Sequence, residues 1–272
     1  MGISRTTCQY QAKLKADQDL QEALTALTTK HASIGYWQCC YRLWNKGHLW
    51  NHKKIYRVYT EMKLNIRRRA KKRLPERVKQ QLSVPDKPNQ VWSIDFMSDT
   101  LLDGRRFRLF NVMDDFNRES LAIEVDTSLP SLRVIRVLEK LIKQRGKPAN
   151  IRCDNGPEFI SHKLEEWCSH EDRRITLQFI QPGKPTQNAY IERKNGSIRR
   201  ELLNAYLFNS LADVRSLSSA WRVDYNTERP HKSLGYMSPT NYAEQHYKRS
   251  VADQVLYPQT ANENNSKIER AV

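Results

Sequence analysis

Apolar residues recur at helical spacing over the first part of the chain. Asp17 precedes a run whose apolar face is formed by Leu20, Ala23, Leu24 and Leu27. Gly35 and Gly47 interrupt the next segment, and the residues after them have a second apolar face at Ile55, Val58, Tyr59 and Met62. Short helices with tight glycine turns and basic polar faces are typical of a helix-turn-helix unit. We therefore predict a helical, helix-turn-helix-like DNA-binding region over residues 1–62.

From residue 89 the pattern changes to the alternation of β-strands. In NQVWSIDFM, Val91, Ser93 and Asp95 fall on one face and Trp92, Ile94 and Phe96 on the other. RRFRLFNVMDD and ESLAIEVDT predict two further strands, and Asp103-Gly104 is the expected turn of the first hairpin. The chain thus begins its second domain with a three-stranded meander.

Helices and strands alternate after the meander. SLRVIRVLEKLIKQRG is amphipathic with helical period and ends at Gly146. A strand at NIRCD, a helix through LEEWC, a strand at ITLQFI and helices from about residue 187 follow. This order predicts an α/β domain with one mixed sheet and helices packed on it, over residues 89–247. Trp92 and Trp167 are expected in its core, and the polar residues 248–272 are expected to form a disordered tail.

The charge of the chain changes the interpretation of the segment between the two domains. The 272 residues carry 46 Lys and Arg against 30 Asp and Glu, a formal net charge of +16, which favours a polyanionic partner. Residues 63–79 alone hold nine basic residues and one acid, so we interpret 63–88 as a basic arm and linker. A merely solvated linker is the alternative. The expected phosphate contacts are Arg67, Arg68, Arg69, Lys71, Lys72 and Arg73.

Composition also bears on compartment and metal content. There is no run of eighteen apolar residues, no apolar stretch typical of a signal peptide, and an odd number of cysteines, five. These features predict a cytosolic protein without a membrane span. A zinc site built from His31, His48, His52 and the cysteines at 39 and 40 is an alternative, but adjacent cysteines point their thiolates in divergent directions.

Three acids stand at the ends or edges of the predicted elements of the second domain. Asp95 lies in the first strand, Asp154 closes the fourth, and Glu192 begins the helix after the fifth. Each has an ordinary explanation: a solvent-facing strand residue, a turn at Asp154-Asn155-Gly156, and an acid in a first helical turn. Together, carboxylates from three elements of one sheet are hard oxygen ligands suited to two Mg²⁺ or Mn²⁺ ions.

Several long motifs resemble one family. The segments WSIDFMSDTLLDGRRFRLFNVMDDFNRESLAIEVD, IRCDNGPEFIS, FIQPGKPTQNAYIERKNGSIRRELLNAY and YNTERPHKSLGYMSP are similar to the second-frame product of IS-three family insertion-sequence transposases. The likeness extends upstream through IGYWQCCYRLWNKGHLWNHKKIYRVYTEMKLNIRRRAKKRLP and covers nearly the whole chain. It implies an RNase H-like, integrase-type catalytic core with a D-D-E triad that cuts and joins DNA.

The resemblance assigns roles residue by residue. The triad, and hence the metal ligands, falls on Asp95, Asp154 and Glu192, whereas Asp114 and Asp115 are rivals expected to be structural. Residues expected to shape the surroundings of the acids are Asn155, Gly156, Glu158, Asn188 and Asn195. Residues expected to contact DNA near the site are Lys184, Arg193, Lys194 and Arg199. The implied cofactor is Mg²⁺ or Mn²⁺, as two ions.

The resemblance also implies partners and leaves alternatives. It predicts binding to terminal repeats and target DNA, a homo-oligomer on DNA, fusion or association with an upstream-frame product, and location in the bacterial cytoplasm at the nucleoid. Between Asp154 and Glu192 lie 192 − 154 − 1 = 37 residues, two more than is usual in that family. A catalytically silent DNA-binding remnant that regulates transposition is the leading alternative, and a metal-dependent nuclease of the same fold is a third.

Overall fold

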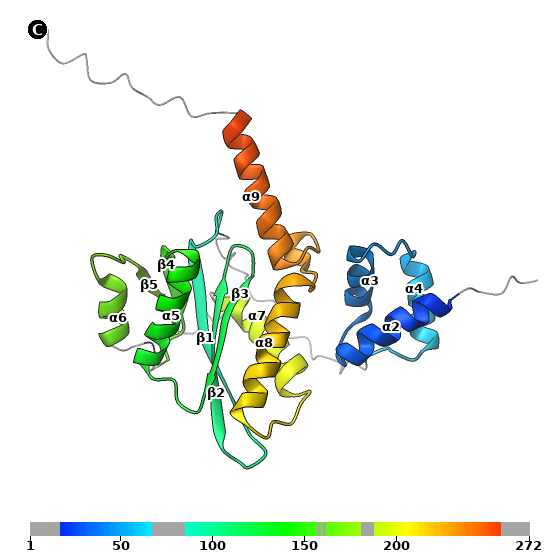
Figure 1. Cartoon of the computed structure of the whole chain (residues 1–272), viewed down its shortest axis with the longest axis horizontal. Coiled ribbons are helices and arrows are strands. Elements are labelled where there is room, and N and C mark those ends of the chain that lie inside the picture. Colours follow the sequence, from blue (N-terminus) through cyan, green and yellow to red (C-terminus); the bar gives the residue numbers. More distant parts are fainter. Residues whose placement is uncertain (1–16, 67–84, 157–158, 160–161, 181–187, 257–272) are drawn as a thin grey trace, which may run out of the picture. The chain divides into compact units, whose positions relative to one another are not determined.

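The computed structural model describes residues 17–66, 85–156, 159, 162–180 and 188–256 (Figure 1). The chain divides into two compact units, Met1–Glu76 and Arg77–Val272. The division falls within the segment whose charge predicts an arm between domains.

The first unit contains three helices with a core of their own. They are α2 (Gln18–Lys30), α3 (Tyr36–Asn45) and α4 (His52–Glu61). The apolar faces expected from sequence are the buried ones, and Leu24 and Ile55 are fully buried. Asp17 precedes α2 as expected but does not cap it: its carboxylate accepts a 2.7 Å hydrogen bond from Arg57. This pair ties the start of α2 to α4.

The cysteines of the first unit are part of its core. Cys39 and Cys40 have no exposed surface, and burial raises the pKa of the Cys39 thiol to about 12. Both side chains pack among the apolar residues of the three helices. His48 instead stacks on Trp50 with 4.4 Å between ring centroids. Packing therefore accounts for these side chains.

The second unit is built on a five-stranded mixed sheet. Its strands are β1 (Val91–Thr100), β2 (Arg106–Asp114), β3 (Ser120–Asp126), β4 (Asn150–Cys153) and β5 (Thr176–Phe179), in the order β3-β2-β1-β4-β5. The first three strands form the antiparallel meander expected from sequence, and β4 and β5 add parallel to β1. β1 is therefore the central strand and joins the two parts of the sheet.

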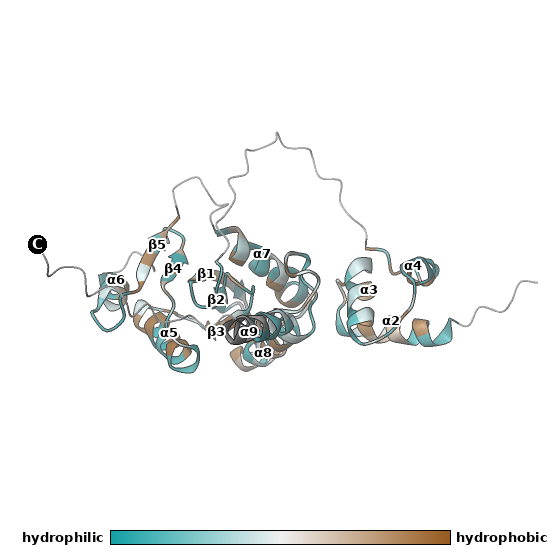
Figure 2. Cartoon of the chain, turned by 90° about the horizontal axis from the view of Figure 1, so that it is seen from above, coloured by the Kyte–Doolittle hydropathy of each residue, from teal (hydrophilic) through white to brown (hydrophobic). Residues whose placement is uncertain are grey.

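Helices cover both faces of this sheet (Figures 1 and 2). Helices α5 (Ser131–Arg145) and α6 (His162–Ser169) pack on one face. Helix α7 (Ala189–Ile198), a π-helical turn η2 (Arg199–Leu203) and α8 (Leu211–Thr227) pack on the other. The α/β class with a mixed sheet, predicted from the element order, is thus confirmed.

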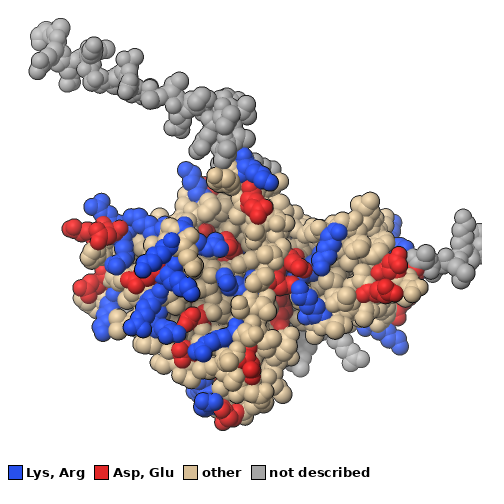
Figure 3. Space-filling view, viewed as in Figure 1, with Lys and Arg blue, Asp and Glu red and all other residues tan. Residues whose placement is uncertain are grey.

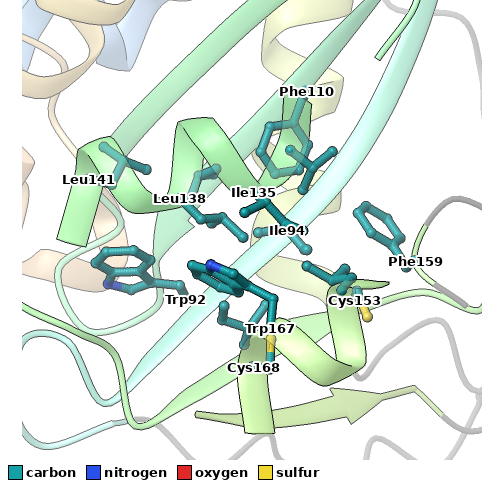
Figure 4. Close-up of a cluster of buried hydrophobic side chains, with 14 of the residues drawn as sticks. Trp92, Ile94, Phe110, Ile135, Leu138, Leu141, Cys153, Phe159, Trp167 and Cys168 are labelled. Atoms are coloured by element: carbon teal, nitrogen blue, oxygen red, sulfur yellow. The ribbon is translucent and has the colours of Figure 1, made fainter. Parts of the chain in front are cut away.

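The alternation along β1 decides which side chain enters which layer. Trp92 and Ile94 point into the core under α5 and α6, where they meet Leu138 and Trp167 (Figure 4). Both tryptophans expected in the core are there. Asp95, the next residue after Ile94, points to the opposite face, where it lies beneath α7. Asp95 is the first residue of β1 after its four buried positions and is half-buried.

The motif YNTERPHKSLGYMSP fastens the last helices to the sheet. Asn226 in α8 accepts from the Ser120 N–H over 2.9 Å and donates to the Ser120 carbonyl over 3.0 Å. Its side-chain amide thus binds the backbone of β3 as a neighbouring strand would. Arg229 donates to both carboxylate oxygens of Glu201 in η2. Side-chain hydrogen bonds to the fold account for these two polar residues of the motif.

Helix α9 (Pro239–Leu256) continues past the point where a disordered tail is expected. The prediction of disorder is therefore wrong for residues 248–256. The segment from Asn241 to Leu256 holds neither Gly nor Pro, so nothing in it stops a helix. The rest of the expected tail, 257–272, lies outside the described residues. No helix in the described ranges combines the length and apolar character that a membrane span requires.

Candidate active site

The register of the parallel strands brings two of the predicted acids together. Strands β1 and β4 pair from Val91–Asn150 to Ser93–Arg152. Extending this register by two residues sets Asp95 beside Asp154, on neighbouring strands about 4.8 Å apart. Two residues before each acid, Ser93 and Arg152 both contact Asp115, and the Asp95 side chain faces α7. The pairing of β1 with β4 thus brings the backbone at Asp95 close to the point where the chain leaves β4 at Asp154.

The chain turns immediately after Asp154. Its Oδ1 accepts a 3.0 Å hydrogen bond from the Gly156 N–H, which closes a turn two residues long. Asn155 Nδ2 donates to the Ile180 carbonyl over 2.9 Å and so holds the turn against the end of β5. Asn155 and Gly156, two of the three residues expected to shape this turn, make these contacts, and the third, Glu158, lies outside the described residues. Their contacts fix the direction in which Asp154 leaves the sheet.

Glu192 completes the set from the opposite side. It lies in the first turn of α7, the helix that covers Asp95, and partial burial raises its pKa. The pKa of Asp95 is raised to about 6, chiefly by burial and further by the negative charges of Asp154 and Glu192. Hydrogen bonds from the Phe96 N–H and Asn195 oppose this rise. The charges of Asp154 and Glu192 therefore both act on Asp95, and the action of the three acids as one site stays a prediction.

A pair of asparagines positions Asp95. Asn195 Nδ2 donates to Asp95 Oδ2 over 2.7 Å, and Asn195 Oδ1 accepts from Asn111 Nδ2 over 3.0 Å. Asn111 lies directly across from Asp95 in the antiparallel β1–β2 pairing and is fully buried. The sequence motifs place Asn195 near the site but do not indicate Asn111. Only the register of β2 against β1 identifies Asn111, and the sequences of the two strands do not predict that register.

Below the acids, a buried ion pair joins the two strands that carry them. Asp115 has no exposed surface and accepts from Ser93 Oγ over 2.7 Å and from an Arg152 guanidinium nitrogen over 2.9 Å. Asp114 lies beside it, where its carboxylate accepts from the N–H groups of Asn89 and Phe116. Both aspartates thus make internal contacts that fit the structural role expected of them. Asp115 is the link between β1 and β4.

Two of the basic residues expected to meet DNA are engaged within the protein. Lys194 has 1% of its surface exposed and its Nζ donates to the Val112 carbonyl over 3.1 Å, so the prediction that it contacts a phosphate is wrong. Burial lowers the pKa of this amine to about 7. Arg199 donates to Asp99 Oδ2 over 2.6 Å and to the Ser98 carbonyl. A phosphate that binds Arg199 would have to displace the carboxylate of Asp99 from its guanidinium. Arg193, in contrast, is exposed, as a residue that contacts DNA must be.

The remaining predicted site residues divide into two groups. Asn188 is buried immediately before α7, and its Oδ1 has no hydrogen-bond partner within the described ranges. The others lie outside the described residues: Arg67, Arg68, Arg69, Lys71, Lys72, Arg73, Glu158 and Lys184. Their roles stay predictions.

The donor set fits a hard divalent cation in its chemistry. Carboxylates are the hard oxygen ligands that such an ion prefers, and the pKa of Asp95 is raised partly by the charges of the other two acids. Their side chains do not converge as ligands: in the described part of the chain, no three His, Cys, Asp or Glu groups are arranged to hold a metal ion. The residue types fit such an ion, but the three side chains would have to move toward one another to bind it.

Comparison with known proteins identifies the family. Residues 85–185 match the integrase core domain, and residues 173–239 match a second model of the same description. The insertion element IS407 31.7 kDa protein of Burkholderia multivorans is 42% identical over 254 residues, which cover 93% of this chain and 90% of that protein. The chain belongs to the insertion-sequence transposases with an integrase core domain. The insertion element IS476 39.2 kDa protein of Xanthomonas euvesicatoria is 40% identical over 89% of this chain and 70% of its own length.

The fold of the transposase is that of retroviral integrases. A simian T-cell lymphotropic virus intasome, solved in complex with the PP2A regulatory subunit B56 gamma, matches with a TM-score of 0.52. The match covers 82% of the transposase and 74% of that chain at 18% identity. The RNase H-like core implied by the sequence motifs is thereby confirmed, together with a helical region before it.

Proposed function

We propose that this transposase cleaves DNA at the ends of its own insertion sequence and joins those ends to other DNA, using Asp95, Asp154 and Glu192 with divalent metal ions. The observation that carries the proposal is that Asp95 in β1 is close enough to Asp154, just after β4, and to Glu192 in α7 for their charges to raise its pKa. Negative charges held close to one another repel unless a cation compensates them. The integrase core domain spans all three acids across its two matched ranges.

The carboxylates would hold Mg²⁺ or Mn²⁺ as oxygen ligands, as two ions. Such ions supply Lewis-acid stabilisation at both the attacking and the leaving oxygen of a phosphodiester. In cleavage, the oxygen of water forms a bond to phosphorus and the bond to the 3′-oxygen breaks, which leaves a 3′-hydroxyl. In joining, that hydroxyl attacks a second phosphodiester and displaces its 3′-oxygen. Neither step requires a covalent bond to the protein.

The remaining residues of the site orient the carboxylates or contact the DNA phosphates. Asn195 fixes the rotation of the Asp95 carboxylate, and Gly156 fixes that of Asp154. Arg193, exposed one residue after Glu192, is our candidate for a phosphate contact beside the acids. Lys184 and the six basic residues of the arm, from Arg67 to Arg73, extend this contact along the DNA.

Assembly belongs to the same proposal. We assign the chain to the second-frame products of the IS-three family, acting as a homo-oligomer on paired element ends, with an upstream-frame product supplied separately or by fusion, in the bacterial cytoplasm. A similarity at 40% or more to two insertion-element proteins supports the assignment to mobile elements.

The test uses labelled element-end DNA with Mg²⁺ or Mn²⁺, with and without the upstream-frame product. We expect nicking and joining by the wild type and neither by Asp95→Asn, Asp154→Asn or Glu192→Gln. Asp172→Asn is the matched control, because Asp172 is exposed and distant from the acids along the sequence. Its activity should equal that of the wild type.

A second candidate is a DNA-binding protein without catalysis. The observation in its favour is that the described side chains form no closed metal-binding group. It predicts retained binding to element ends and no nicking or joining in any divalent metal. That outcome, in a preparation whose binding is intact, would replace the first proposal by the second.

A further inference from the structure

The outer face of helix α5 carries a row of basic residues. Its inner face packs Val134, Leu138 and Leu141 into the core beneath the sheet. The row on the outer face consists of Arg136, Lys140, Lys143 and, just past the helix end, Lys147, all exposed. Lys and Arg side chains gather over this part of the molecule in Figure 3. We call these four residues the α5 row.

The α5 row differs from the other basic residues of the helix in lacking counter-charges. Arg133 pairs with Glu124 over 2.8 Å, and Arg145 pairs with Glu119. The single acid of the helix, Glu139, accepts a hydrogen bond from Trp167 and lies 3.7 Å from Arg173. Within the described ranges, no member of the α5 row has an ion pair. The row therefore presents uncompensated positive charge to solvent.

The spacing of the row matches a phosphate backbone. Arg136, Lys140 and Lys143 follow one another at intervals of four and three, so they lie along one line of the helix. Seven residues at about 1.5 Å each span about 10 Å. One strand of duplex DNA presents a phosphate about every 3.4 Å along its axis, so this length faces about three phosphates. Long, flexible basic side chains neutralise phosphates without reading bases.

The row lies on the opposite side of the sheet from the catalytic acids. α5 packs on the layer that contains Trp92 and Ile94, whereas Asp95 points beneath α7. The sheet and a helix about 10 Å thick therefore separate the row from the acids. A straight duplex whose phosphodiester is at Asp95 does not reach the row.

We propose that the α5 row binds the backbone of a second DNA segment, separate from the phosphodiester held at the acids. This inference rests on the proposed function, because a joining reaction brings two DNA segments to one protein. The row serves the segment that receives the cut end, without sequence preference, and its contribution is electrostatic.

The test compares two triple variants of the full chain with equal changes in net charge. Arg136→Gln, Lys140→Gln and Lys143→Gln remove the row within the helix, and glutamine keeps side-chain length and helix propensity. The matched control replaces exposed basic residues elsewhere in the same unit: Lys163→Gln, Arg174→Gln and Lys232→Gln. Circular dichroism checks that each variant folds.

Binding to a labelled 30-base-pair duplex of arbitrary sequence is measured without metal over a range of KCl. We expect the slope of log K against log salt to fall by about 2 to 3 in the α5-row variant, at about 0.9 per phosphate lost. The control should keep the wild-type slope. Equal slopes in the two triple variants would overturn the inference, since net charge alone would then govern binding. Absence of binding by the wild type would instead remove the proposed function itself.

A second measurement addresses the order of events. The α5-row variant should cleave a labelled element end within twofold of the wild-type rate, while the concentration of unlabelled duplex needed for half-maximal joining rises tenfold or more. Equal losses of cleavage and joining would show that the row binds the DNA being cut, which contradicts the inference.

Discussion

Asn195 Nδ2 donates to Asp95 Oδ2 over 2.7 Å and so joins helix α7 to strand β1 at the proposed catalytic acids. The other end of the same amide accepts from Asn111, whose Nδ2 can only donate. Asn111 therefore decides which end of the Asn195 amide faces Asp95. Glu192 lies one turn earlier in α7, so this bond also restrains one acid relative to another.

Asn195→Ala should lower metal affinity and joining together. The change frees the Asp95 carboxylate to rotate, and loss of a partner that orients a metal ligand typically costs 10- to 100-fold. We expect losses of about that size in Mn²⁺ affinity, followed by titration, and in the joining rate. Asn111→Ala should act in the same direction but less strongly, because the amide of Asn195 loses only its orienting partner.

The matched control for these variants is Asn209→Ala. Asn209 is exposed before α8, and its side chain makes no hydrogen bond in the described ranges. It should bind Mn²⁺ as the wild type does. An Asn195→Ala protein that binds Mn²⁺ as tightly as this control would show that Asp95 needs no orientation.

Asp115→Asn should destabilise the second unit strongly. The change leaves the Arg152 guanidinium buried without its counter-charge, and breaking a buried ion pair by removing one partner typically costs about 3–5 kcal/mol. Urea unfolding followed by circular dichroism measures the loss. The double variant Asp115→Asn with Arg152→Met should be more stable than the single variant, because the guanidinium left without its partner is then removed as well. A double variant less stable than the single one would contradict this account.

Stability should depend on pH through Asp114. Burial raises its pKa to about 6, whereas in the unfolded chain the carboxyl loses its proton near pH 4. Between these values the folded protein binds more protons, so the free energy of unfolding falls as pH rises from about 4 to about 6. The contribution of Asp114 is therefore fully present below pH 4 and is lost above pH 6.

The size of this effect follows from the difference between the two pKa values. It corresponds to about 3 kcal/mol. Asp114→Asn has no proton to lose, so the stability of the wild type minus that of the variant should fall by about this amount between pH 4 and pH 7. Groups shared by the two proteins cancel in the difference. Urea unfolding at four pH values measures it, and a difference independent of pH would show that Asp114 does not titrate in this range.

The parts of the site that depend on local pattern were predictable. The alternation of Val91, Ser93 and Asp95 with Trp92 and Ile94 identifies the face of β1, because side chains on a strand alternate with period two. The end of β4 at Cys153, directly before Asp154, follows from a short apolar run that meets a turn sequence. Both positions depend only on residues within a few places along the chain.

The parts that depend on packing between distant segments were not predictable. Asn111 is identified only by the register of β2 against β1. A shift of that register by one residue would place the Asn111 side chain on the other face of the sheet. Arg193 and Lys194 are adjacent and equally basic, yet one is exposed and the other is buried. Charge alone favours DNA contact for both. The rotation of α7 over the sheet separates them, and that rotation is set by contacts with residues far away along the chain, such as Val112.

Asp95→Asn should stabilise the metal-free protein while it abolishes joining. In the absence of a cation, Asp95 is partly buried among like charges, so its ionised form at pH 7 is unfavourable. Asparagine has the same size and no charge, although one of its two hydrogen bonds is lost because only one oxygen remains. We expect the free energy of unfolding to rise by about 1–3 kcal/mol at pH 7.

Added metal should narrow this difference and then reverse it. A cation that binds the folded state stabilises the wild type in proportion to the logarithm of its concentration over the dissociation constant, whereas the Asp95→Asn variant binds it weakly. Thermal unfolding with and without 10 mM Mg²⁺ tests the reversal, and Asp172→Asn should follow the wild type throughout. A variant that is less stable than the wild type without metal would mean that the three carboxylates do not repel one another. The acids would then lack the crowding that makes a cation necessary.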